Sequence, residues 1–90
     1  MTNRQRKALR LVRTVRGQLD AIARMMESDD AVQMDISNQL LASQAIIKAA
    51  NKEIVYNLLE TKIGEANDQA ELPEKLEEVS EYIDRIFKIM

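Results

Sequence analysis

Basic side chains are concentrated at the start of this sequence. The first 24 residues contain seven of them and one acidic residue, Asp20. The seven are Arg4, Arg6, Lys7, Arg10, Arg13, Arg16 and Arg24. All but Lys7 are arginines, whose planar guanidinium groups suit bidentate contact with phosphate. This segment therefore predicts binding to nucleic acid or another polyanion, with a solvated helix face or an acidic protein partner as the alternatives.

Two residue types that carry much catalytic and metal chemistry are missing. The 90 residues include no cysteine and no histidine. Thiolate and imidazole ligands, Ser-His-Asp triads and Cys-His nucleophiles are therefore excluded. A run of carboxylates near the C-terminus has the chemistry to coordinate a hard cation such as Mg²⁺, but such runs more often form a solvated face, so we predict no metal and no cofactor. These carboxylates are Glu71, Glu74, Glu77, Glu78, Glu81 and Asp84.

The composition predicts an all-α fold. Good helix formers fill most of the chain, and its glycines and proline are Gly17, Gly64 and Pro73. We expect a single domain over residues 1–90, with helices at about 3–28, 30–63 and 73–90. The expected helix ends are Asn3 and either Asp29 or Asp30 as N-caps, Gly64 just past the second helix, and Pro73 in the first turn of the third.

Apolar residues recur at alternating steps of four and three in the first and third helices. A repeat of about 3.5 residues forms a seam on which two helices pack side by side. The second helix is apolar on more than one side, which one short chain does not cover. We therefore predict an antiparallel hairpin of two long helices plus a shorter third helix, completed into a four-helix bundle by a second chain. The seam residues are Ala8, Val12, Val15, Leu19, Ile22 and Met26, and then Leu72, Leu76, Val79, Ile83, Ile86 and Met90.

The arginines of the first helix are expected to face away from its seam. Several of them lie two positions before a seam residue, which is about 200° around a helix. These are Arg6, Arg10, Arg13 and Arg24. A dimer or tetramer repeats such a basic surface by symmetry. We predict that double-stranded DNA contacts Arg6, Lys7, Arg10, Arg13, Arg16 and Arg24.

A short motif overlaps the last of these arginines. Residues 15–27 read VRGQLDAIARMME, with Gly17 and Gln18 in mid-helix, and the next helix contains Asp35-Ile36 and Gln39-Leu40. This combination resembles the CsoR/RcnR/FrmR family of metal- and formaldehyde-responsive transcriptional repressors over roughly residues 4–88. The resemblance implies an all-α dimer or dimer of dimers that binds operator DNA and releases it when an effector binds.

In that family the effector is sensed through a cysteine near the start of the second helix and a histidine or cysteine near its end. By register, Gln33 or Val32 occupies the first position, and Leu58 and Lys62 occupy the later ones. These side chains supply neither thiolate nor imidazole. The resemblance therefore implies a repressor that does not sense soft metals or thiol-reactive species.

Without those ligands, the equivalent region is a candidate pocket for a small organic effector. Its expected lining is Gln33, Tyr56, Leu58 and Lys62, with Gln33 and Lys62 as the polar groups. The alternative is that core residues fill the site and that it senses nothing.

Two other functions compete with a DNA-binding repressor. In a helical enzyme similar to chorismate mutase, Arg10, Gln44 and Lys48 would hold carboxylates in a pocket between helices. In a structural or heteromeric partner, the bundle would persist without DNA binding. Thr14 and Gln44 stand where the repressor family commonly has basic residues. We predict the repressor and not an enzyme.

Long apolar stretches are absent from the sequence. No uninterrupted apolar run exceeds three residues, so no segment is suited to span a bilayer. The basic N-terminus is not followed by the apolar stretch of a secretory signal. We therefore expect a soluble, cytoplasmic protein.

Overall fold

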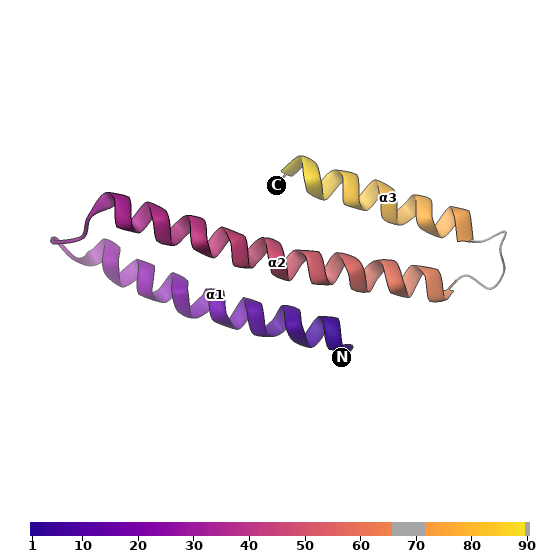
Figure 1. Ribbon diagram of the computed structural model, residues 1–90, viewed down its shortest axis with the longest axis horizontal. Coiled ribbons are helices and arrows are strands. Elements are labelled where there is room, and N and C mark those ends of the chain that lie inside the picture. The colour runs from indigo at the N-terminus through magenta and orange to yellow at the C-terminus, as the bar shows by residue number, and fades with distance from the viewer. Residues whose placement is uncertain (66–71, 90) are drawn as a thin grey trace.

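The computed structural model describes residues 1–65 and 72–89. These residues form three helices, α1 (Asn3–Glu27), α2 (Gln33–Glu65) and α3 (Leu72–Ile89), and no strand. The helices α1 and α2 form an antiparallel hairpin, and α3 folds back along the C-terminal part of α2 (Figure 1). Among the described residues, α1 and α3 flank α2 without contacting each other. The predicted all-α hairpin with a shorter third helix is confirmed.

The start of α1 is fixed by a capping box one residue earlier than expected. Thr2 is the N-cap, and its Oγ1 accepts a hydrogen bond from the Gln5 backbone N at 3.1 Å. In return the Thr2 backbone N donates to Gln5 Oε1 at 2.8 Å. The expected cap, Asn3, is the first helical residue instead. The reciprocal bonds with Gln5 favour Thr2, because they satisfy two backbone N–H groups at once.

The turn between α1 and α2 is longer than expected. Asp29 and Asp30 lie in this turn, which Ser28 closes by accepting hydrogen bonds from the backbone N of Asp30 and Ala31. Neither aspartate therefore caps α2, whose first backbone bonds run to the carbonyl oxygen of Val32. At its other end α2 continues through Gly64. No described glycine has positive φ, so the expected helix end at Gly64 is not formed.

The hairpin buries one residue in every seven on each long helix. The buried residues are Ala8, Val15 and Ile22 in α1 and Ile36, Ser43 and Ala50 in α2. The other seam positions of α1, and the apolar residues at the same spacing in α2, are 42% to 64% exposed; they are Val12, Leu19 and Met26 in α1 and Leu40, Ile47 and Ile54 in α2. A seam with a 3.5-residue repeat offers two positions per heptad, and the single facing helix covers one of them. The predicted seam of α1 is therefore only half buried within one chain.

A polar contact lies at the centre of the hairpin. Ser43 is 1% exposed, and its Oγ donates a hydrogen bond to Gln18 Oε1 at 3.0 Å. Because an unpaired hydroxyl buried at this depth is costly, Gln18 fixes which residues of α1 and α2 face each other. The Gln of the Gly17-Gln18 motif thus has a structural role in the helix pairing. In α3 the side chain of Val79 is buried, 2% exposed, as its seam position predicts.

Candidate nucleic-acid interface

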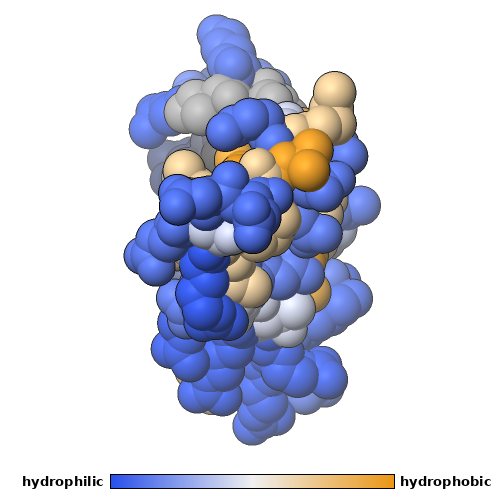
Figure 2. All heavy atoms as spheres, turned by 90° about the vertical axis from the view of Figure 1, so that its left-hand side faces the viewer, coloured by the Kyte–Doolittle hydropathy of each residue, from blue (hydrophilic) through white to orange (hydrophobic). Residues whose placement is uncertain are grey.

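The six residues predicted to contact DNA all lie on α1, and all are exposed. Arg6, Arg10, Arg13 and Arg24 lie within about 60° of one another at about 100° per residue, opposite the face buried against α2. We call these four residues the arginine strip. Arg16 and Lys7 flank the strip on opposite sides. Figure 2 views the end of the molecule at which α1 and α2 are joined, and hydrophilic residues predominate over the lower part of this view.

The N-terminal part of the strip borders a shallow hollow. Its volume is about 390 Å³, and it is lined by Asn3, Arg6, Leu9, Arg10 and Arg13. One Arg6 N–H donates to Asn3 Oδ1 at 3.2 Å. Three arginines line this hollow, and their guanidinium groups suit an anion of phosphate type, since each presents several N–H donors in a plane.

The strip arginines and Arg16 have no acidic partner among the described residues. Within residues 1–65 and 72–89, no Asp or Glu oxygen lies within 4.0 Å of a guanidinium nitrogen of Arg10, Arg13, Arg16 or Arg24. Arg6 has its amide partner Asn3 and likewise no ion pair in the described part of the chain. The positive charge of this face is therefore not neutralised by the described residues.

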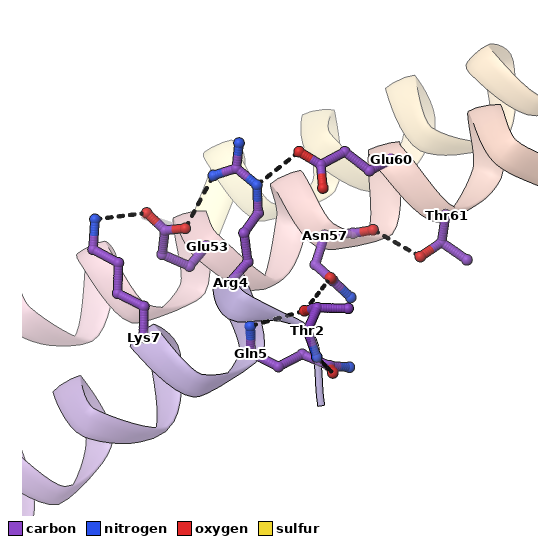
Figure 3. A network of polar contacts seen from close by, with 8 residues as sticks. All are labelled: Thr2, Arg4, Gln5, Lys7, Glu53, Asn57, Glu60 and Thr61. Atoms are coloured by element: carbon purple, nitrogen blue, oxygen red, sulfur yellow. Dashed lines mark hydrogen bonds and ion pairs between the residues drawn. The ribbon is translucent and has the colours of Figure 1, made fainter.

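The first turns of α1 are arranged differently (Figure 3). Arg4 Nη1 lies 3.1 Å from Glu53 Oε2, and Arg4 Nε lies 2.8 Å from Glu60 Oε1. Lys7 Nζ lies 3.2 Å from the other oxygen of Glu53. The Arg4 guanidinium also lies over the Tyr56 ring, 5.1 Å from its centroid. Lys7, one of the six predicted DNA contacts, is thus paired within the chain.

We call these contacts, with the Thr2–Asn57 bond, the N-terminal lock. Thr2 Oγ1 donates to Asn57 Oδ1 at 2.7 Å. A hydrogen bond from Lys7, and a smaller contribution from Arg4, hold the pKa of Glu53 below its usual value. The lock joins the start of α1 to the second half of α2. Sequence reasoning missed it, because Arg4 and Glu53 are separated by 49 residues and no local motif links them.

The predicted effector residues are not gathered in one chain. Gln33 begins α2, whereas Leu58 and Lys62 lie in its last two turns. At about 1.5 Å per residue, Gln33 and Lys62 are roughly 45 Å apart along the helix. Lys62 Nζ instead lies 3.5 Å from both Glu65 and Glu78, whose charges raise the pKa of Lys62. This pocket therefore stays a prediction.

The residues named for the enzyme alternative are also dispersed. The hollow that includes Arg10 does not include Gln44 or Lys48, both of which are exposed on α2.

Comparison with known proteins identifies the family. Residues 4–85 match the family model for metal-sensitive transcriptional repressors. The chain belongs to this family. Copper-sensing transcriptional repressors CsoR from Mycobacterium ulcerans and Mycobacterium tuberculosis are each 44% identical to it over 61 residues, which is 68% of this chain. The chain spans about half the length of these curated relatives, 51% and 50%. No solved structure gives a significant match.

Membership of the metal-sensitive repressor family confirms the resemblance seen in the sequence and raises the question of a metal. Soft metals are bound in proteins mainly by thiolate and imidazole, and by methionine thioether in some copper(I) sites; these 90 residues contain five methionines but neither cysteine nor histidine. Residues 1–65 and 72–89 contain no group of three or more carboxylates placed to hold an ion. Glu71, in the carboxylate run, lies outside the described residues. The donor set does not fit the metal that the family name implies.

The helices were also compared with the requirements of a membrane span. None of the described helices has the length and apolar character needed to cross a bilayer.

Proposed function

We propose that this member of the repressor family binds double-stranded DNA through the arginine strip and Arg16. The single observation that carries the proposal is the unneutralised charge of this face: exposed arginines that lack ion pairs among the described residues. An exposed helix face that serves solubility alone ordinarily mixes signs. Here Asp20 is the one acidic residue in the first 24.

Duplex DNA matches this face because arginines along one side of a helix can reach several phosphates of a backbone. Each phosphate neutralised releases counterions, which contributes about 0.9 to the slope of log affinity against log salt concentration. Five arginines in each of two copies reach up to roughly ten phosphates. Binding of this kind is strong at low salt and falls steeply as salt is added.

We propose that the protein acts as a self-associated bundle. A groove of about 590 Å³ runs between α1 and α2, and its lining includes Val12, Ile47 and Ile54. These side chains are 49%, 49% and 43% exposed, a large apolar face for one chain to leave in water. A second hairpin seated on this groove completes the heptad seam and presents two arginine strips.

The test is titration of a labelled DNA duplex with the purified chain, followed by fluorescence anisotropy. Between about 50 and 200 mM salt the affinity is expected to fall about a thousandfold or more. Ile47→Glu is expected to give a monomer by light scattering and to lose most of the affinity, because half of the phosphate contacts go. A flat salt response, or no binding at low salt, would contradict the proposal and favour a partner without DNA binding.

A further inference from the structure

Gly17 lies in the middle of α1, and neither the backbone conformation nor the packing of the described residues requires glycine there. Glycine is the residue that least favours a helix after proline. Neither described glycine has positive φ, so the backbone does not require glycine here. Apart from its chain neighbours and the adjacent helix backbone, a Cβ built at Gly17 meets no heavy atom of the described residues within 4 Å, so no close packing among them requires glycine either.

The position of Gly17 on the helix is informative. It follows Arg13 by four residues and lies seven residues from both Arg10 and Arg24. At about 100° per residue it points in the same direction as these arginines, about 200° away from the buried Val15. The missing side chain therefore leaves a gap in the arginine strip, between Arg13 and Arg24.

We propose that Gly17 is a positioning residue that lets the backbone of a DNA duplex approach the surface of α1 closely. The inference rests on the proposed function. With no Cβ in the way, a phosphate can come against the helix at Gly17, within reach of Arg13 on one side and Arg24 on the other. A methyl group there holds the duplex away from both guanidinium groups and lengthens their contacts, which weakens charge-assisted hydrogen bonds steeply.

Two neighbouring features limit how the duplex crosses this gap. Asp20 lies three residues after Gly17 and repels phosphate, so the closest approach is expected on the Arg13 side. The apolar groove lies on another side of α1, because Val12 is about 140° from Gly17 around the helix. A second hairpin seated in the groove therefore does not reach Gly17, which leaves the gap open to DNA.

The test compares Gly17→Ala with Gly64→Ala as a matched control. Both glycines are helical, and a Cβ at either meets nothing within 4 Å. Both substitutions should leave or raise the melting temperature, because alanine favours a helix. For a labelled duplex at fixed salt, Gly17→Ala is expected to lower the affinity about tenfold, the equivalent of one lost phosphate contact, and Gly64→Ala to leave it unchanged. Gly17→Leu should lower it further.

The outcomes separate this inference from the proposed function. If the unmodified protein does not bind the duplex, the proposed function fails and the inference fails with it. If the unmodified protein binds and Gly17→Ala binds equally well, only the inference is wrong. A fall in melting temperature or a change in mass by light scattering with Gly17→Ala, but not with Gly64→Ala, would show that Gly17 packs against another copy and would overturn the inference.

Discussion

Two groups of basic side chains on α1 differ in their contacts with α2. Near the N-terminus, Arg4 and Lys7 are paired with Glu53 and Glu60 in the N-terminal lock. Opposite the middle of α1, residues 36–52 of α2 contain no acidic residue and two lysines. The strip arginines also point away from α2, so they have no carboxylate within pairing distance in the described chain. The direction of each side chain and the composition of α2 together determine which cations of α1 are paired.

This difference changes how the basic segment is interpreted. Counted together, the seven basic residues of the first 24 indicate one polyanion-binding surface. The structure divides them into two groups with different partners. Arg4 and Lys7 join the start of α1 to α2, whereas the strip and Arg16 have no ion pair among the described residues. Substitutions in the two groups are expected to affect different measurements, stability in one and DNA affinity in the other.

The largest effect is expected from the double substitution Arg10→Ala and Arg13→Ala. These arginines border the same hollow, and each is expected to contribute about tenfold to duplex affinity, so the double variant should bind about a hundredfold more weakly. Anisotropy titration measures this loss. The mass by light scattering and the melting temperature should stay unchanged, because neither side chain packs in the hairpin.

Two control substitutions sharpen this result. Arg85→Ala removes an exposed charge from α3 and should leave duplex affinity nearly unchanged. Arg4→Ala removes a charge of α1 that is held in the lock, and it should lower the melting temperature more than the affinity. Equal losses of affinity in all these variants would show that net charge, and not the strip, governs binding.

A smaller effect is expected from Glu53→Gln, which opens the lock. Glu53 is the carboxylate shared by Arg4 and Lys7, so its neutralisation releases Lys7 near the end of the strip, while Arg4 keeps its ion pair with Glu60. Duplex affinity should rise about fivefold, and the slope of log affinity against log salt should steepen by about 0.9 for each copy as Lys7 gains a phosphate. An unchanged slope would mean that Lys7 lies too far from the bound duplex to contribute.

Asp20→Asn is expected to have a slightly smaller effect of the same sign. Asp20 is the single carboxylate among the cations of α1, and it lies one turn from Arg16, Arg24 and Gly17. A unit charge close to phosphate is worth up to about 1 kcal/mol in water, so the substitution should raise affinity about threefold. A matched Glu81→Gln change on α3 should have no effect. A loss of affinity with Asp20→Asn would instead indicate that Asp20 accepts a hydrogen bond from the ligand.

The helices and the strip were predictable because both follow from spacing along one helix. The observed helices begin and end within about three residues of their expected positions. The N-cap was placed at Asn3, although the spacing of Thr2 and Gln5 carries the capping-box pattern. The start of α2 was placed too early, because Asp29 has the side chain of a cap but lies in a turn closed by Ser28.

The N-terminal lock and the candidate effector pocket depend on which residues meet across helices. Spacing within one helix does not supply that information. Arg4 and Glu53 come together only once the hairpin register is set by buried pairs such as Gln18 and Ser43. For the same reason the sequence did not separate Lys7 from the arginines. The hairpin does not bring the candidate effector residues Gln33 and Lys62 together, because a single copy of α2 holds them at opposite ends.

The smallest effect is expected in the pH dependence of stability, and it isolates the lock. In the folded chain a hydrogen bond from Lys7, and a smaller contribution from Arg4, lower the pKa of Glu53 from its ordinary 4.5. The unfolded chain therefore binds the proton more readily, so this carboxylate contributes stability that is fully present above about pH 4.5 and is lost as the pH falls through the lower folded pKa.

Glu53→Gln has no such proton to bind. Its melting temperature should lie a few degrees below that of the unmodified chain near neutral pH. The gap between the two melting temperatures should narrow as the pH falls below about 4.5. Arg10→Ala, which removes a cation without a carboxylate partner, should show no narrowing. Thermal melts followed by circular dichroism at a series of pH values measure both gaps. A gap for Glu53→Gln that stays constant with pH would mean that Glu53 holds the hairpin by packing and not by its charge.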